Sequence, residues 1–536
     1  MNTDLLERPE LRDAATQARI QPAIRPTSLL RFLTCGSVDD GKSTLIGRML
    51  HDAGLVPTDQ LESLEKDSRR YGTTGGVDYA LLVDGLAAER EQGITIDVAY
   101  RYFATSKRAF IVADTPGHQQ YTRNMATGAA GADLAVILVD ARKGILPQTR
   151  RHSFIAGMLR VRHLVLAVNK MDLVGFDKNS FDALVAEYRR AVEPLGFASI
   201  TAIPLCAREG DNLVLRSLRM PWYSGPTLLG LLETIDAGQI ADTTAALRLP
   251  VQWVNRRSEN FRGYAGTIAH GSIAPGDKIR VLPSGLRGTV ARVVTADGDL
   301  PRGIAGQAIT LTLREEIDIS RGDVIVGEAD RLTATRELSA RILWMDEKPL
   351  DPAAEYEIRI GCNTANARIS AIRHTIDIHS YAPTPSAGLE ANGIGLVELK
   401  LDRPVVAAAY DEDCDLGGFI LVDKHSNATA ALGMVTEQET AAPAASAPAL
   451  REWHGRSLIK AASWRAIGSI DTFILSWIFT GQVKTAGTIA FTEVFTKIGL
   501  YYLHERAWVI LPWGKVGGSI AGEGYLAGVM RKIFKK

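Results

Sequence analysis

A loop near the start of the chain, Gly-Ser-Val-Asp-Asp-Gly-Lys-Ser, has the residue types and spacing of a phosphate-binding loop. It follows an apolar run at 29–34 that predicts a strand and precedes residues 43–50, which predict a helix. Backbone N–H groups and the helix N-terminus can then surround nucleotide phosphates, with Lys42 as a point charge and the Ser43 hydroxyl on Mg²⁺. The residues predicted to bind nucleotide here are Gly36, Ser37, Val38, Asp39, Asp40, Gly41, Lys42, Ser43 and Thr44.

A second segment, Asp-Thr-Pro-Gly-His, follows the apolar strand predicted at 110–113. Asp114 at a strand end can hold the metal through water, and the Gly117 amide can reach the γ-phosphate. The same residues also fit an ordinary turn. Downstream of a phosphate loop we interpret them as the next part of the nucleotide site, which adds Asp114, Thr115, Pro116, Gly117 and His118.

A third segment, Asn-Lys-Met-Asp, predicts which nucleotide base the site selects. It directly follows the apolar run 164–168. Guanine offers N1–H and an exocyclic amine, two donors that the Asp172 carboxylate can accept together, whereas adenine lacks that amine. A site that pairs buried polar groups strongly rejects a ligand lacking the partner, so the pattern favours GTP over ATP. The residues predicted to surround the base are Asn169, Lys170, Met171 and Asp172, with the backbone amide of Ala207 on guanine O6.

A polar loop at 89–97 lies between the first two segments and contains Thr95. Its hydroxyl can ligate Mg²⁺ and its amide can contact the γ-phosphate, and both are released after hydrolysis, which makes an ordering switch. The alternative is that Thr95 simply begins a strand. The predicted metal ligands are therefore Ser43, Thr95 and Asp114.

Together these segments resemble the translation-factor branch of GTPases, and more closely the large GTP-binding subunit of bacterial sulfate adenylyltransferase, over about residues 28–437. Asp40 stands where elongation factors carry His, and Cys206 where most relatives carry Ser. The segments that carry the resemblance are 39–44, 87–100, 120–128, 140–144 and 148–153.

The resemblance implies an α/β P-loop GTPase domain followed by two small β-barrels. It implies a heterodimer in which a smaller catalytic partner binds ATP and sulfate and forms adenosine 5′-phosphosulfate and pyrophosphate, while GTP hydrolysis here drives that step. It also implies that His118 orients the attacking water, with Lys42 and Thr95 as the other catalytic residues. The alternative for His118 is that it caps the turn after Gly117. The alternative function is a translation-elongation-type GTPase that binds aminoacyl-tRNA.

Charge and cysteine content bear on these two functions. The chain has 61 Lys and Arg against 61 Asp and Glu, so no overall basic field indicates a nucleic-acid partner. Its four cysteines lie far apart without any Cys-x-x-Cys spacing, which favours reduced thiols in a cytosolic protein over zinc or disulfides. We also expect no secretory signal, because no continuous apolar stretch lies near the N-terminus.

The spacing of apolar, helical and turn-forming segments changes along the sequence and divides the chain into successive parts. Apolar strands first alternate with helical stretches, which predicts a parallel sheet covered by helices; short strands with Gly and Pro turns then predict barrels. The predicted parts are an N-terminal extension (1–27), the GTPase domain (28–242), two β-barrel domains (243–335 and 336–437), an Ala/Pro linker (438–450) and a helical tail (451–536).

The tail contains two apolar stretches, 467–480 and 486–503, with basic residues on both outer flanks. This pattern favours a hairpin that crosses the inner membrane twice with both ends in the cytoplasm. It is similar to a small bacterial domain of unknown function that is regarded as a membrane protein. The alternative is a soluble helical pair. Some relatives carry an adenylylsulfate kinase here, but the tail lacks the second phosphate loop that this activity needs.

Overall fold

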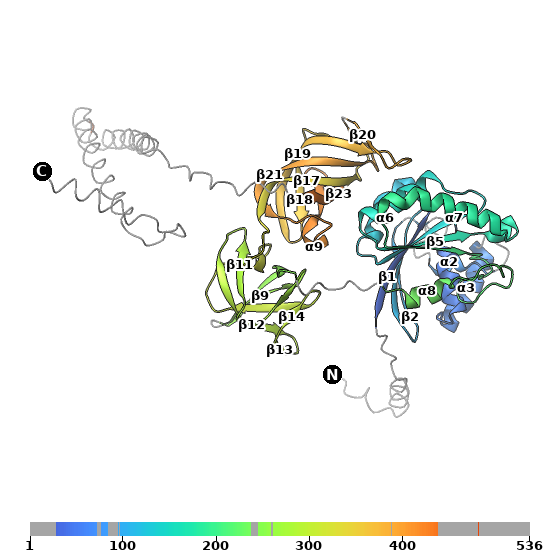
Figure 1. Cartoon of the computed structure of the whole chain (residues 1–536), viewed down its shortest axis with the longest axis horizontal. Helices are drawn as coiled ribbons and strands as arrows, with labels where there is room; N and C mark the ends of the chain where they lie inside the picture. Colours follow the sequence, from blue (N-terminus) through green and yellow to red (C-terminus); the bar gives the residue numbers. More distant parts are fainter. Residues whose placement is uncertain are drawn as a thin grey trace, which may run out of the picture. The chain divides into compact units, whose positions relative to one another are not determined.

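The computed structural model describes residues 28–71, 77–83, 95, 97–236, 245–258, 261–386, 388–437 and 481 (Figure 1). The chain divides into two compact units, Met1–Glu439 and Thr440–Lys536. The predicted N-terminal extension, the linker and, apart from Gly481, the tail hairpin lie outside the described residues. Within the described part of the chain, no helix is both long and apolar enough to cross a membrane.

A six-stranded sheet forms the centre of the first domain, in the order β2-β3-β1-β4-β5-β6 (Figure 1). Five strands are parallel, and β2, at one edge, is antiparallel to β3, so the predicted parallel sheet carries one antiparallel strand. Only a short turn joins β2 to β3, and a parallel pair needs a longer crossover. The strands are β1 Leu29–Gly36, β2 Ala99–Ala104, β3 Ala109–Asp114, β4 Leu134–Asp140, β5 His163–Asn169 and β6 Ser199–Pro204.

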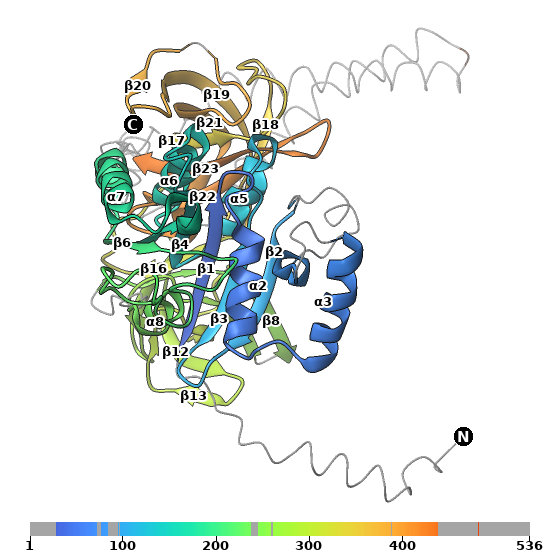
Figure 2. The ribbon, with the colours of Figure 1, turned by 90° about the vertical axis from the view of Figure 1, so that its right-hand side faces the viewer.

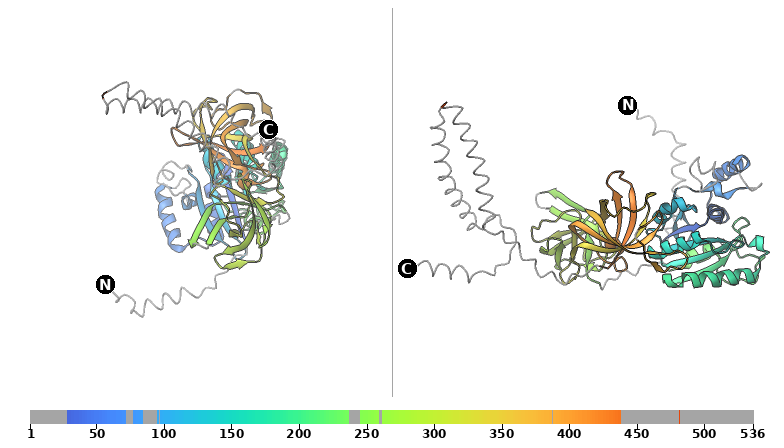
Figure 3. Two further views of the ribbon diagram at one scale, coloured as in Figure 1. Left: turned by 90° about the vertical axis from the view of Figure 1, so that its left-hand side faces the viewer. Right: turned by 90° about the horizontal axis from the view of Figure 1, so that it is seen from above.

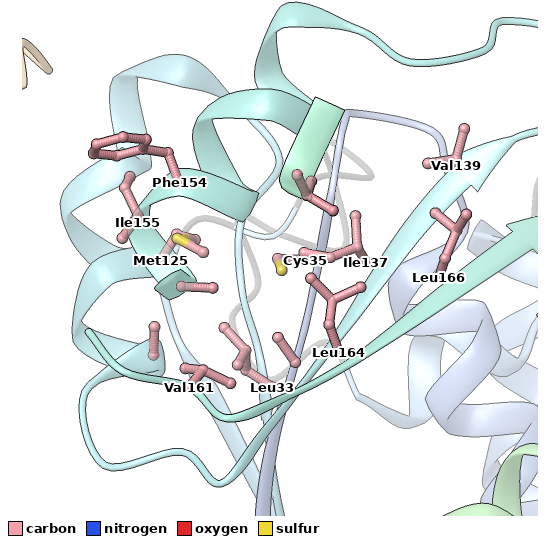
Figure 4. Close-up of a cluster of buried hydrophobic side chains, with 14 of the residues drawn as sticks. Leu33, Cys35, Met125, Ile137, Val139, Phe154, Ile155, Val161, Leu164 and Leu166 are labelled. Atoms are coloured by element: carbon pink, nitrogen blue, oxygen red, sulfur yellow. The ribbon is translucent and has the colours of Figure 1, made fainter. Parts of the chain in front are cut away.

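Helices cover both faces of this sheet, because its central strands are apolar on both sides. In β1, Leu33 and Cys35 face a core shared with α5, α6 and α7, whereas Leu30 and Phe32 face the core that contains α2 and α8. Figure 4 shows the first of these cores, with Met125 and Phe154 packed over the strands. The helices are α2 Lys42–Asp52, α3 Thr58–Tyr71, α5 Thr122–Ala129, α6 Pro147–Met158, α7 Lys178–Val192 and α8 Leu228–Thr234.

The next part is a β-barrel, drawn yellow-green in Figures 1 and 3. The first two strands, β7 and β8, are separate because the chain leaves one neighbouring strand, β16, and joins another, β9. The strands are β7 Arg248–Pro250, β8 Trp253–Ser258, β9 Phe261–Thr267, β10 Ser272–Ile273, β11 Lys278–Leu282, β12 Arg287–Thr295, β13 Gly298–Leu300, β14 Gly303–Ile304, β15 Ala308–Leu313 and β16 Val324–Gly327.

A second barrel follows and is closed, since β18 pairs with both β22 and β19 (Figure 2). Its six strands surround an apolar core that includes Trp344, Ile358 and Leu421. Its elements are β17 Ala334–Trp344, β18 Tyr356–Ile360, β19 Asn363–Ile376, β20 Pro383–Thr384, β21 Ile394–Val406, the one-turn helix α9 Cys414–Gly417, β22 Gly418–Asp423 and β23 Thr429–Glu437. The fold class predicted for residues 28–437 is thereby confirmed.

Candidate nucleotide-binding site

Apart from Thr95, which precedes β2, the predicted site residues lie at or just after the carboxyl ends of parallel strands β1, β3, β5 and β6. These ends meet at one edge of the sheet, which is where open α/β sheets bind their ligands. The register places Thr34 of β1 beside Asp114 of β3, and Asp140 of β4 beside Asn169 of β5. Motifs that are far apart in the sequence therefore lie side by side.

The loop between β1 and α2 is tight, and its backbone is left-handed at Asp39 (φ 66°) and Gly41 (φ 90°). Lys42 begins α2, and its ammonium group donates to the carbonyls of Ser37 (2.9 Å) and Gly36 (3.4 Å). Burial lowers the pKa of Lys42, and the nearby Asp114 and Asp40 carboxylates oppose that shift. The Lys42 side chain is therefore held across the loop in which a bound phosphate would lie.

Asp40 does not face outward from this loop. Its side chain is buried, Oδ2 accepts the Ser37 amide at 2.6 Å, and Oδ1 has no partner among the described residues. Burial raises the pKa of Asp40, while the Lys42 charge and the Ser37 amide lower it. The carboxylate of Asp40 therefore acts within the loop, and the predicted contact of Asp40 with the nucleotide stays a prediction. The side chains of Val38 and Thr44 are partly exposed beside it.

The three predicted metal ligands are brought together. The Ser43 hydroxyl donates to Asp114 Oδ2 at 2.6 Å and lies 3.3 Å from the Thr95 hydroxyl. Asp114 is fully buried, and its Oδ1 accepts the Thr34 hydroxyl at 2.8 Å. Two hydroxyls and a carboxylate are hard oxygen donors of the kind that Mg²⁺ prefers, so this set fits the ion.

The segment after Asp114 packs directly on the phosphate-binding loop. A Cβ at Gly117 would lie 2.6 Å from Lys42 Nζ and 2.8 Å from the Val38 amide, so only glycine fits there. Thr115 and Pro116 are buried, and the Thr115 hydroxyl donates to the Thr34 carbonyl at 2.7 Å.

His118 lies at the start of a short 3₁₀ turn, Gln119–Tyr121, and is partly exposed. Its imidazole makes no capping hydrogen bond and lies edge-on to the Tyr121 ring, with the ring centroids 6.2 Å apart. The turn is instead closed by the backbone bond from the Tyr121 amide to the His118 carbonyl. The capping alternative for this histidine is therefore not what the structure shows.

Asn169 joins the phosphate side of the site to the base side. Its Nδ2 donates to the Asp40 carbonyl at 2.8 Å, and its Oδ1 accepts the Ala207 amide at 2.9 Å. Both bonds are buried, and a Cβ at Gly41 would lie 2.7 Å from Asn169 Nδ2. The predicted donation of the Ala207 amide to guanine stays a prediction, and it would require this amide to be shared with Asn169.

On the base side, Asp172 is half-buried and Met171 packs in the core. The Cys206 thiol donates to Asp172 Oδ1 at 3.2 Å. Burial, followed by the Asp172 carboxylate, raises the pKa of Cys206 to about 12, so the thiol stays protonated and can donate. Cys206, which stands where most relatives carry Ser, therefore still supplies a hydrogen-bond donor to the Asp172 carboxylate.

Sequence reasoning gave no role to Asp140, the last residue of β4. Its carboxylate pairs with Lys170 Nζ at 3.1 Å and with Arg142 at 2.8 Å, and Lys170 also donates to the Asp39 carbonyl. Burial would raise the pKa of Asp140, but the hydrogen bonds from Arg142 and Lys170 outweigh it and hold the pKa well below its usual range. Its place at a strand end on the same edge of the sheet is a signal that could have indicated this role.

His152 on α6 is a second residue without a predicted role. It is fully buried; one ring nitrogen lies 2.8 Å from Gln148 Nε2, and Nδ1 has no partner among the described residues. Burial, together with the Lys42 and Arg151 charges, lowers the pKa of His152 to about 3. The imidazole is therefore neutral at physiological pH.

Known proteins resemble successive parts of the chain. Residues 27–261 match the family described as "Elongation factor Tu GTP binding domain", residues 337–436 match "GTP-eEF1A C-terminal domain-like", and residues 458–509 match "Predicted membrane protein (DUF2061)". Over 412 residues the chain is 55% identical to a curated protein of Citrobacter koseri called "Sulfate adenylyltransferase subunit 1". That alignment covers 76% of this chain and 86% of the relative.

Solved structures also resemble the chain. Sup35 complexed with GMPPNP is 22% identical, with 80% of this chain and 98% of that chain covered and a TM-score of 0.35. The S. cerevisiae Ski7 GTPase-like domain bound to GTP is 18% identical, with 78% and 98% covered and a TM-score of 0.44.

Proposed function

Because this chain belongs to the sulfate adenylyltransferase subunit 1 family of GTPases, we propose that it is the GTP-hydrolysing subunit of a sulfate adenylyltransferase. GTP hydrolysis in its first domain would drive the reaction of ATP with sulfate to adenosine 5′-phosphosulfate and pyrophosphate. The observation that carries this proposal is the 55% identity to a subunit 1 relative over 412 residues. The proposal is also supported by the side chains of Ser43, Thr95 and Asp114, which lie within hydrogen-bonding distance of one another through Ser43.

Mg²⁺, when bound, would neutralise phosphate charge as it does in other P-loop GTPases. The residues that would hold it are Ser43 and Thr95 through their hydroxyls and Asp114 through its carboxylate. Thr34 donates to the second oxygen of Asp114 and so fixes the orientation of that carboxylate. Thr95 lies between the 3₁₀ helix Tyr79–Leu82 and β2, and its hydroxyl lies 3.3 Å from that of Ser43 on the phosphate side.

Lys42 would bind the phosphates, because its ammonium is already held over the loop by two carbonyls. Gly117 would offer its amide at the same place, since it lies against Lys42 and the Val38 amide. His118 would orient the attacking water, since its imidazole is partly exposed and not used in capping. His118→Ala should lower the GTP hydrolysis rate about 10²- to 10⁴-fold while GTP affinity changes little. An unchanged rate would remove His118 from the catalytic residues.

Asp172 would select guanine by accepting N1–H and the exocyclic amine together. The Cys206 thiol holds one oxygen of that carboxylate, and Asn169 ties the base loop to the phosphate loop. Specificity for guanine would then depend on the Asp172 carboxylate, whose orientation is fixed by the Cys206 thiol. A base without the matching donors would leave this carboxylate unpaired, which costs binding free energy.

The name "subunit 1" of the relative implies a partner subunit. We propose that a smaller catalytic chain binds ATP and sulfate, and that the two chains form a heterodimer or a larger assembly of it. We place the GTPase in the cytoplasm, with residues 451–536 as an attachment to the inner membrane. The match of residues 458–509 to a family described as a membrane protein supports that attachment.

The translation-factor alternative is not favoured. A chain with equal numbers of acidic and basic residues lacks the overall positive field that binding aminoacyl-tRNA would use. A filter-binding assay with charged tRNA separates the two functions, and we expect no GTP-dependent retention.

The test is sulfate-dependent pyrophosphate release from ATP by this chain purified together with its catalytic partner. We expect strong stimulation by GTP and none by a non-hydrolysable GTP analogue. Absence of sulfate-dependent release under every condition, with GTP hydrolysis intact, would refute the assignment to sulfate activation.

A further inference from the structure

The first barrel has a seam where two neighbouring strands separate. Strands β7 and β16 are antiparallel, with Pro250 opposite Val324. The ladder continues one step further, through Val251 N to Asp323 O (2.8 Å) and Gly322 N to Val251 O (2.9 Å). After that step the chain turns away to pair with β9, through Gln252 N to Ala265 O (2.8 Å).

An open groove of about 480 Å³ occupies this seam. One wall is formed by Gln252 and the start of β8 as far as Arg256, and the other is the segment 318–321 that leads into β16. These two walls are the stretches that the β7–β16 ladder would have paired had it continued. Among the described residues, β8 pairs only with β9, so its other backbone edge faces the groove side without a strand partner.

Trp253 is the largest apolar side chain exposed here, with 69% of its surface accessible. It occupies the first position of β8, on the wall of the groove. Trp is enriched among the residues that dominate binding energy at protein interfaces, and an unpaired strand edge is a template for pairing with another chain. This combination favours an extended polypeptide as the occupant.

The groove is positively charged. Its lining contains three arginines, Arg256, Arg262 and Arg321, against one carboxylate, Asp318. Asp318 pairs with Arg262 at 2.8 Å, whereas neither Arg256 nor Arg321 forms an ion pair with any described residue. Arg262 Nε is also buried without a hydrogen-bond partner in the described part of the chain. The excess positive charge of the groove therefore favours the binding of acidic groups that come from outside this barrel.

We propose that this groove, lined by Trp253, Arg256, Arg262 and Arg321, binds an extended acidic segment of the catalytic partner subunit. The segment would lie along the free edge of β8, with its carboxylates on the arginines and an apolar side chain against Trp253. The proposal rests on the proposed function, because it needs a partner subunit. This chain's own tail is a poor occupant, since residues 451–536 contain more basic than acidic residues.

The test measures the affinity of the full chain for its purified catalytic partner by calorimetric titration. Trp253→Ala should weaken binding about 30-fold or more, as hot-spot tryptophans do. The double reversal Arg256→Glu with Arg321→Glu should weaken it by a similar factor and reduce its salt dependence. Arg302→Glu, on an exposed arginine of the same barrel outside the groove lining, is the matched control and should leave the affinity unchanged.

Basal GTP hydrolysis by each variant alone should equal that of the unaltered chain, because no groove residue belongs to the nucleotide site. Unchanged partner affinity in both groove variants, while the unaltered complex still shows GTP-stimulated pyrophosphate release, would overturn the docking proposal and leave the proposed function standing. Loss of that release in the unaltered complex would instead refute the proposed function.

A photo-crosslinking amino acid in place of Trp253, used in the purified complex, identifies the occupant. We expect a crosslink to an acidic stretch of the catalytic subunit. A crosslink to a second copy of this chain, to nucleic acid, or to a basic stretch of the partner would contradict the proposal.

Discussion

Replacement of Asn169 with alanine should both destabilise the GTPase domain and weaken nucleotide binding. The change leaves the Asp40 carbonyl and the Ala207 amide buried without their partner. Each unpaired group costs about 1–3 kcal/mol, so the expected loss is about 2–6 kcal/mol. For a domain of this size, where 1 kcal/mol corresponds to about 2–4 °C, such a loss lowers the melting temperature by about 4–24 °C.

Asn212 supplies a matched control. It is also buried and also bridges two backbone groups, the Pro204 carbonyl (2.9 Å) and the Ser217 amide (2.9 Å), but it takes no part in the phosphate loop. Its left-handed backbone (φ 59°) adds about 1 kcal/mol to the cost of alanine. Asn212→Ala should therefore destabilise the domain at least as much as Asn169→Ala.

The assay is thermal unfolding of the full chain together with titration by a fluorescent GDP analogue. We expect both variants to unfold earlier, and only Asn169→Ala to lose affinity for GDP, by about tenfold or more. Equal GDP affinity in the two variants would refute the view that Asn169 couples the phosphate loop to the base loop. A melting temperature unchanged by Asn169→Ala would refute the stability argument.

Three further substitutions test other parts of the site. Gly117→Ala should abolish measurable GTP hydrolysis in a phosphate-release assay, because its Cβ would lie 2.6 Å from Lys42 Nζ; normal hydrolysis would contradict this packing. Cys206→Ala should weaken GTP binding about 3- to 10-fold in equilibrium titration by removing the donor to Asp172, and Cys206→Ser should restore it; equal affinities in all three would remove the thiol from the site. The pKa of His152 is about 3 in the folded protein and about 6.5 in the unfolded chain. As the pH falls below about 6.5, the unfolded chain therefore binds a proton at this residue while the folded protein does not, and this favours unfolding. Stability should therefore drop by about 2 kcal/mol from pH 7 to pH 5 through this residue, and His152→Asn should flatten that slope in unfolding titrations, with exposed His425→Asn as the unchanged control.

The sequence predicted the strands that end in functional residues, since each motif directly follows an apolar run. The ends of β1, β3 and β5 agree with those predictions within two residues. The sequence also predicted Ser43 and Asp114 as ligands of one metal ion, which requires that they lie together. These predictions needed only the residue pattern of each motif.

Other features depended on contacts between elements that pattern alone does not specify. The antiparallel direction of the edge strand β2 follows from the short turn to β3, which the predicted parallel sheet did not include. The bridge made by Asn169 and the anchoring of Lys170 by Asp140 depend on which strands are neighbours. Asp40 faces inward because the tight loop places its carboxylate on the Ser37 amide, a local geometry that composition does not reveal.

The central claim is that the guanine site of this chain drives sulfate adenylylation by its partner, and a change of base specificity tests it most directly. Asp172→Asn replaces one acceptor with an amide donor, which suits the C2 carbonyl of xanthine better than the C2 amine of guanine. In the purified complex, we predict that sulfate-dependent pyrophosphate release loses its stimulation by GTP and becomes stimulated by XTP. Release that still responds to GTP, or that responds to neither nucleotide while the unaltered complex responds to GTP and the variant hydrolyses XTP, would contradict the account.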